Sequence, residues 1–454
     1  MQNIQTSRPQ MSLARSARGR TLAVGFGTTT TMWMVAYFSL MQPGLVVGEA
    51  LFALTLLCLF AGGFVAGRHT QTGEVAWIAG LKVGLTSAML NLLLLGSLVS
   101  GKSEIDKVLN GWSWVLGLFG GSIILAMLGA VVGSAMRHSH ASRTMNWHSA
   151  FLTVAAATVG LLLVTGGLVT GLEAGLAVPD WPNSFGHNML LYPLAKMVGG
   201  VFYEHAHRLY GMLVGVTAIT VAATMFALDS RRWMRGLAVA YLLMVCVQGY
   251  MGGARVFEKS TALAIVHGVF GQIVFATIAC IAAFASTTWK SGLPAMSKPS
   301  ARIDRAMSMT LTIALVVQLG LGALYRHLQR AMANPPEPIH ALYTHILVAV
   351  IVTALVIFVA GRAWGMYRDS PVLPALGRTL LILVGVQIML GISAMMVVWM
   401  SKPHEPTPAY EVIITTAHQM TGALLLMTSA LLTLWTRRLL AAEPRVAEVQ
   451  HATA

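Results

Sequence analysis

Four histidines of this 454-residue chain stand inside long apolar segments, where an imidazole is costly unless it has a partner or a function. They are His207, His267, His345 and His418. One histidine of this kind would indicate no more than a polar contact between two helices. All four, however, fall within roughly two turns of the same end of their predicted helices. We therefore expect them at similar depth on one side of a helical bundle.

Two imidazoles at equal depth on facing helices can ligate the iron of a planar macrocycle from both faces. Small residues follow three of the histidines at helical spacing and leave room for a flat ring, as Gly422 does after His418. Four histidines then predict two haem sites. The natural pairs are His207 with His267, and His345 with His418.

A bare zinc or copper ion is the weaker alternative, because such ions more often recruit cysteine or carboxylate ligands. The three cysteines, Cys58, Cys246 and Cys280, stand singly in apolar segments without the spacing of a zinc site or of covalently attached haem. We interpret them as buried thiols.

Around the first histidine, the segment from Glu204 to Arg208 carries more chemistry. Glu204, His207 and Arg208 fall on one helix face, whereas His205 points away and is expected on the outer surface. Glu204 is either an ion-pair partner of Arg208 or a proton-exchanging group beside a haem edge.

The loop 173–206 precedes this helix and is the longest on its side of the membrane. Its prolines and Trp181 predict a rigid lid at the membrane interface. On the same side, Arg255, Arg326 and His327 are either contacts for haem propionates or solvated loop charges.

The elements that position these residues are membrane-spanning helices. The chain is 56% hydrophobic and 10% charged, too few charges to cover a soluble surface. Its net charge of +14 comes from loops rather than from a basic patch interleaved with aromatics, so nucleic-acid binding is not expected. We predict spans at 21–41, 46–67, 75–100, 112–136, 147–172, 207–228, 236–253, 262–286, 307–325, 341–361, 378–400 and 411–436.

Arginines and lysines concentrate in alternate loops, which places those loops and both termini in the cytoplasm and the four histidines near the opposite face. The first 20 residues are rich in arginine and serine and resemble a mitochondrial transit peptide. The same bias continues through every later loop, so a cytoplasmic flank, and with it the bacterial cytoplasmic membrane, is favoured over the mitochondrial inner membrane.

The chain divides near residue 145. Residues 1–145 hold four spans with the glycine pairs Gly63/Gly67, Gly117/Gly121 and Gly129/Gly133, whose spacing lets helices approach closely. Their role is not indicated by any chemistry.

The later spans repeat a unit in which a helix with Gln-x-x-x-Gly precedes a helix with His. The unit occurs as Gln248/Gly252 with His267, as Gln318/Gly322 with His345, and as Gln387/Gly391 with His418. The expected fold is an all-α polytopic membrane protein: an eight-helix core of two pseudo-symmetric four-helix bundles, residues 146–290 and 291–440, four extra N-terminal transmembrane helices, and a cytoplasmic tail, 441–454.

With these features together, the sequence resembles the haem A synthase family (COX15/CtaA) over about residues 147–437. The motifs that carry the resemblance are Glu204-x-x-His207-Arg208, the run from Gly175 to Trp181, the run from Gly322 to His327, and the single histidines 267, 345 and 418.

The resemblance implies an oxidoreductase that converts the C8 methyl of haem O to a formyl group, giving haem A for terminal oxidases. It implies a prosthetic haem b on His345 and His418, substrate haem near His207 and His267, and Glu204 as the catalytic residue. Oxygen, an electron donor, haem O synthase, membrane lipid and further copies of the chain are the partners it suggests.

Three departures from the family pattern stand out. Val178 and Ser184 lie in a region where many members carry cysteines, Thr170 stands where an arginine is common, and the four N-terminal spans are additional. The alternatives are a di-haem b-type electron-transfer cytochrome, which would more often space its haems across the membrane, and a haem-binding assembly or transport protein.

Overall fold

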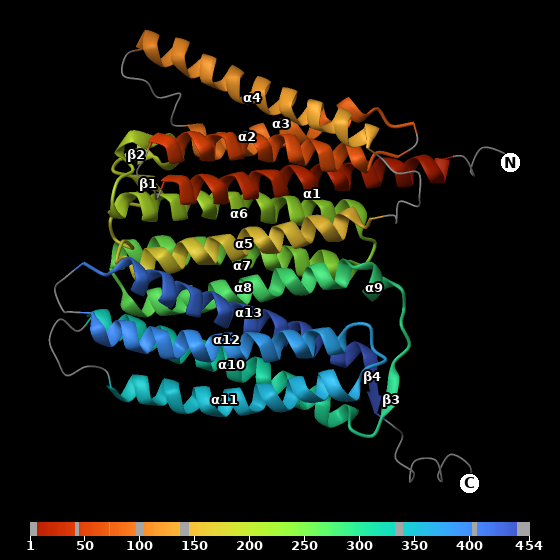
Figure 1. Cartoon of the computed structure of the whole chain (residues 1–454), viewed down its shortest axis with the longest axis vertical. Helices are drawn as coiled ribbons and strands as arrows, with labels where there is room; N and C mark the ends of the chain where they lie inside the picture. The colour runs from red at the N-terminus through yellow and green to blue at the C-terminus, as the bar shows by residue number, and fades with distance from the viewer. Residues whose placement is uncertain are drawn as a thin grey trace. The chain divides into compact units, whose positions relative to one another are not determined.

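Long helices dominate the computed structural model, which describes residues 7–40, 45–71, 73–96, 104–136, 145–331, 339–401 and 406–442 (Figure 1). Every one of the twelve predicted spans coincides with a long helix. Ten helical segments of the described chain are long and apolar enough to cross a membrane, and the described part of α2, Phe52–Arg68, is a shorter apolar helix. The protein is thus an all-α polytopic membrane protein.

The bounds of the long helices are α1 (Ser7–Leu40), α2 (Leu45–Arg68), α3 (Ala76–Leu95), α4 (Glu104–Ala135), α5 (Trp147–Gly171), α6 (Gly200–Leu228), α7 (Arg232–Glu258), α8 (Thr261–Ala285), α10 (Ala301–Ala331), α11 (Ile339–Met366), α12 (Leu373–Met400) and α13 (Ala409–Leu439). The short elements are α9 (Thr287–Lys290), η2 (Met189–Leu191), η3 (Leu194–Lys196), β1 (Asn183–Ser184), β2 (His187–Asn188), β3 (Met296–Lys298) and β4 (Leu440–Ala442). Most of the predicted tail, 441–454, lies outside the described residues, as do His138 and His140 of the loop before α5.

By its own contacts the chain separates into two compact units. The first comprises Met1–Thr165, Glu173–Gly249 and Ala285–Thr287; the second comprises Gly166–Leu172, Tyr250–Phe284 and Thr288–Ala454. The extra N-terminal helices therefore belong to one unit with α6, and α8 belongs with the C-terminal helices. The predicted boundaries at residues 145 and 290 stay predictions.

Glycines bring the N-terminal helices together in the first unit. A Cβ at Gly63 or Gly67 of α2 would overlap the backbone carbonyls of α4, and one at Gly129 or Gly133 of α4 would overlap α2. Helix backbones in direct contact are what GxxxG spacing permits. The same interpretation is wrong for the pair Gly117/Gly121, since an added Cβ there meets no described atom within 4 Å.

Helix α1 packs on α3, α5 and α6 through buried polar and aromatic side chains. The Trp33 indole donates to Asn91 of α3 at 2.9 Å, and the Thr30 hydroxyl lies 2.9 Å from that of Thr158 in α5. Tyr210 of α6 donates its hydroxyl proton to the carbonyl oxygen of Trp33. The N-terminal extension is thus packed directly on the helix that carries His207.

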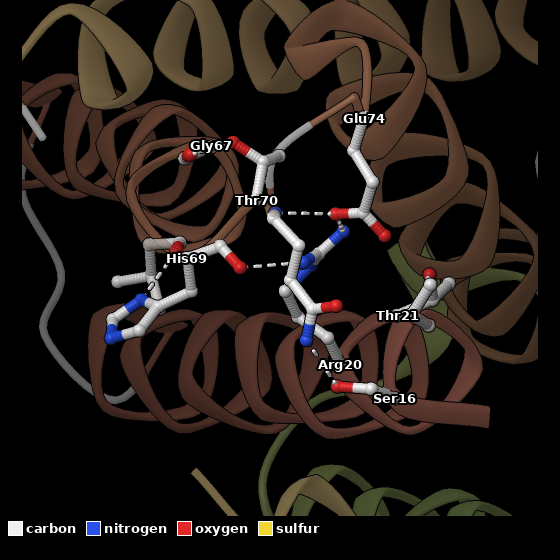
Figure 2. Close-up of polar contacts among 10 residues, drawn as sticks. Ser16, Arg20, Thr21, Gly67, His69, Thr70 and Glu74 are labelled. Carbon is white, nitrogen blue, oxygen red and sulfur yellow. Dashed lines mark hydrogen bonds and ion pairs between the residues drawn. The ribbon is translucent and has the colours of Figure 1, made fainter. Parts of the chain in front are cut away.

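At the predicted cytoplasmic end of this unit, a buried arginine ties α1 to the α2–α3 connection (Figure 2). Arg20, 4% exposed, donates to the Glu74 carboxylate at 2.8 Å and to the His69 carbonyl at 2.6 Å. This ion pair therefore fixes the connection between α2 and α3 to the side of α1.

In the second unit, the apolar core is confined to one end of the α10–α13 bundle. Buried side chains such as Leu311, Val356, Leu380 and Leu432 gather toward the predicted cytoplasmic end. No residue of 316–329, 339–351 or 385–400 is buried. Strand β3 pairs in parallel with β4 next to this core, a contact that the sequence pattern did not predict.

The glycine contacts give a first prediction. Gly67→Ala should lower the free energy of unfolding by about 1–3 kcal/mol, because a methyl group would push two helix backbones apart. Gly121→Ala is the matched control, since its Cβ enters open space and alanine favours helix. Thermal unfolding of the purified protein in detergent measures both variants. Equal melting temperatures for the two would show that α2 and α4 are not in backbone contact.

Candidate functional site

His207 projects from α6 toward α5 in the first unit. Its Nδ1 lies 3.0 Å from the Thr165 hydroxyl, which donates its own proton to the Leu162 carbonyl at 2.9 Å. Thr165 must therefore accept the proton of His207 Nδ1, and the lone pair of the neutral ring then resides on Nε2. A hydrogen bond that fixes the tautomer and orientation of a histidine is typical of metal ligation.

Glu204 and Arg208 lie one turn apart on α6 and form a buried ion pair of 2.7 Å, with 5% and 8% of their side chains exposed. The second Glu204 oxygen accepts the Val178 amide proton at 2.8 Å. Arg208 donates to the carbonyls of Val178, at 2.9 Å, and Asp180, at 2.6 Å. The two charges thus fasten the loop before α6 over the histidine-bearing turn, as the lid interpretation requires.

The loop also covers His205, and here the sequence-based expectation is wrong. His205 was expected on the outer surface, but it is 1% exposed, with Nδ1 3.0 Å from the Ser184 hydroxyl and its ring 5.0 Å from that of Tyr192. Helical geometry correctly points it away from His207. The loop folds back over that face of α6, which helical periodicity could not reveal.

Asp180 organises the tip of the loop. Its two carboxylate oxygens accept the amide protons of Phe185 and Gly186, each at 2.7 Å, and the short β1–β2 ribbon lies in this turn. Burial raises the pKa of Asp180, but the amides of Gly186 and Phe185 and the nearby Arg208 guanidinium outweigh it, so the pKa is lower than usual for Asp. The ionised carboxylate is the form that closes the loop.

In the second unit, the three repeat histidines share one packing arrangement. A Cβ at Gly252, Gly322 or Gly391 would lie only 3.0, 2.9 or 3.0 Å from Cε1 of the histidine on the next helix. Those histidines are His267, His345 and His418 respectively. Each ring thus occupies the space that the glycine leaves open, which explains physically why the glycine recurs in the repeat.

Two glutamines of the repeat, Gln318 and Gln387, lie within hydrogen-bond distance of a histidine ring. Gln318 Nε2 lies 3.1 Å from His345 Nδ1, and Gln387 Nε2 lies 3.3 Å from His418 Nε2. Both glutamine Oε1 atoms and His418 Nδ1 are buried without a hydrogen-bond partner. Unsatisfied polar atoms are rare in protein interiors and typically mark the place of a ligand, ion or water.

His345 of α11 and His418 of α13 belong to the same unit. They lie at the level where α10, α11 and α12 bury no side chains, beyond the apolar core of the bundle. Two imidazoles packed against glycines, with unpartnered polar atoms around them, fit a flat, largely apolar macrocycle. His207 belongs to the first unit and His267 to the second, so their pairing stays a prediction.

Arg326 has a partner that the sequence pattern did not indicate. Its guanidinium lies 3.2 Å from the carboxylate of Glu411, which also accepts the Ser401 hydroxyl proton at 2.5 Å. Arg326 is 16% exposed and Glu411 1%. Arg326 is therefore not a solvated loop charge, and its contact with a haem propionate stays a prediction. The sequence did not indicate a role for Glu411, because a single glutamate in the first turn of an apolar helix is common where the helix dipole favours a negative charge.

The described residues contain no group of three or more His, Cys, Asp or Glu placed to hold a metal ion. The interpretation of the cysteines as buried thiols is wrong for Cys246, which is exposed on α7, while Cys58 and Cys280 are partly buried. A thiol on the outside of an apolar helix can face lipid at little cost.

Asp180 provides a test of the lid. Asp180→Ala should lower the protection of the Phe185 and Gly186 amides against hydrogen exchange about tenfold, because both lose a charged acceptor. In the wild type, the lowered pKa means that protection by the ionised carboxylate is complete at neutral pH and is lost only at a pH below the usual pKa of an aspartate. Exchange measured by mass spectrometry checks both statements, with the amides of 287–300 as internal control. Unchanged protection in the variant would exclude this role of Asp180.

Comparison with known proteins agrees with this geometry. The model of the COX15-CtaA family, described as cytochrome oxidase assembly protein, matches residues 149–430. The chain is also 29% identical over 185 residues to a protein of Shouchella clausii (strain KSM-K16) named heme A synthase, an alignment covering 39% of this chain and 59% of that relative. The family match covers more than half of the chain and includes every candidate histidine; this protein is a member of the COX15-CtaA family.

Proposed function

We propose that the protein is a haem A synthase, which oxidises the C8 methyl of haem O to a formyl group. The observation that carries the proposal is Glu204, a carboxylate buried one turn from His207 under a closed loop. A protein that only held or carried haem would not need a buried acid there. The name of the relative and the family match support the same activity.

The second unit would hold a resident haem b between His345 and His418. The glycines facing the two rings, the unpartnered atoms around them and the lack of buried side chains on α10, α11 and α12 at this level all fit that group. Bound haem b would supply one-electron transfer. Gln318 and Gln387 can rotate their amide groups so that Oε1 accepts the N–H proton of the neighbouring histidine ring. Each buried Oε1 would then have a hydrogen-bond partner, and the other ring nitrogen would be available to ligate iron.

The substrate haem would bind near His207 and His267. In this arrangement Thr165 holds His207 with its Nε2 lone pair available for iron, and Arg208 orients Glu204. Glu204 would hold or accept a proton at its carboxylate while the loop limits access of water. Conversion of a methyl to a formyl group withdraws four electrons from the carbon and therefore needs an oxidant. The family resemblance implies that oxygen is this oxidant and that an electron donor takes part.

The proposed setting is the bacterial cytoplasmic membrane, with both termini in the cytoplasm and the histidines near the opposite face. The multi-pass helices and the family membership support a membrane location, and the distribution of Arg and Lys supports the orientation. Haem O synthase would be the source of the substrate.

Glu204→Gln tests the activity. The substitution removes the ionisable group and keeps the side-chain shape, so conversion of haem O to haem A should fall at least 100-fold, roughly the weight of one acid–base group. The full chain is expressed with haem O synthase in a host without haem A, and extracted haems are separated by chromatography. Glu258→Gln, an exposed glutamate of α7, is the control and should retain activity.

Persistence of haem O with the haem-loaded wild-type protein would refute the synthase and favour a di-haem electron-transfer cytochrome. Full activity of Glu204→Gln would instead remove Glu204 from the reaction.

The ligand pair of the second unit gives a separate prediction. His345→Ala or His418→Ala should abolish the low-spin b-type absorption bands of the purified protein, because a bis-histidine iron loses one ligand. His340→Ala is the control, since this exposed histidine lies at the start of the same helix as His345. An unchanged spectrum in either variant would contradict the assigned ligands.

A further inference from the structure

We infer that Glu411, by offsetting the charge of Arg326, keeps the reduction potential of the haem held by His345 and His418 below the value that the unpaired arginine would give it. The inference rests on the proposed haem b site and assigns Glu411 a role that the family match by itself does not contain. Both residues are positioning residues: they act on the iron through their charges rather than by touching it.

The pair is enclosed to an unusual degree for two charges. Glu411 is 1% exposed and is held on both oxygens, by Arg326 at 3.2 Å and by the Ser401 hydroxyl at 2.5 Å. It also lies in the first turn of α13, where the helix dipole favours a negative charge. The cation, the hydroxyl donor and the helix N-terminus each interact favourably with a negative charge on this carboxylate.

Both charges lie at the haem-binding end of the bundle. Arg326 is one turn beyond Gly322, the residue against which the His345 ring packs. Glu411 is seven residues before His418 on α13, roughly 10 Å along the helix axis. The remaining side chains at this level of α10 to α12 are not buried, whereas Glu411 and most of Arg326 are enclosed.

A buried charge about two helical turns from a ligating histidine would alter the energy of a bound iron. One unit charge at roughly 10 Å, in a medium of effective dielectric constant about 20, changes the equilibrium constant of reduction about tenfold. A negative charge stabilises the more positive ferric state and a positive charge stabilises the ferrous state. Together the two charges largely cancel, and removing one exposes the other.

Glu411→Gln should therefore raise the midpoint potential of the low-spin haem by the equivalent of about a tenfold change in its reduction equilibrium. The double variant Arg326→Gln/Glu411→Gln should return close to the wild-type value, because neither charge remains. Arg326→Lys keeps the charge and should also stay near wild type. Potentiometric titration of the purified haem-loaded protein, at one fixed pH, gives all four values.

A second ion pair on α10 is the matched control. Asp304 accepts from Arg362 at 2.6 Å and is 7% exposed, but it lies 18 residues before Gly322, roughly 27 Å along α10. Asp304→Asn should lower the melting temperature as loss of a buried ion pair does, and should leave the midpoint potential unchanged.

The two proposals fail in different ways. A potential of Glu411→Gln equal to that of the wild type, or a double variant shifted as far as the single one, would overturn the inference while haem A synthesis continued. Failure to bind a low-spin haem in the wild-type protein would instead overturn the proposed function. If Asp304→Asn shifted the midpoint potential as far as Glu411→Gln does, general loosening of the unit would explain both shifts, and the inference would be overturned.

Discussion

The structure depends on fitting imidazole rings between closely packed apolar helices. A histidine side chain on one helix needs space on the next, and in three hairpins that space is the missing side chain of Gly252, Gly322 or Gly391. A methyl group at any of the three would meet the ring at about 3 Å, closer than ordinary van der Waals contact. The rings are therefore fixed in depth and direction by the hairpin that carries them.

Burial of charge is the second constraint, and the chain meets it in the same way at several places. Glu204, Glu411 and Asp304 are all enclosed, and each is paired with an arginine. An isolated buried charge would cost several kcal/mol. Pairing removes most of that cost. The Glu204–Arg208 pair also binds the backbone of the loop before α6. It therefore both neutralises a buried charge and holds this loop over the turn that carries His207.

The N-terminal helices share these rules although they lie outside the family match. Glycines bring α2 and α4 into backbone contact, and Arg20 of α1 pairs with Glu74 of the α2–α3 connection. Tyr210 of α6 bonds to the Trp33 carbonyl of α1. The extension is thus built into the first unit and supports the helix of His207, whereas its sequence indicated only helices that pack closely.

Much of the fold follows from the sequence itself. Apolar length and charge distribution predict twelve spans, and each coincides with a long helix. The recurrence of Gln-x-x-x-Gly before a histidine predicts helical hairpins, and in three of them the glycine lies against the histidine ring. These features are local, because helix formation and membrane insertion depend on neighbouring residues. Three other features depend on segments far apart in the chain: the cover over His205, the partner of Arg326 and the glycines of α4 that remain uncovered. Only tertiary structure decides them, since a helical pattern states which residues share a face but not which loop or helix will meet that face.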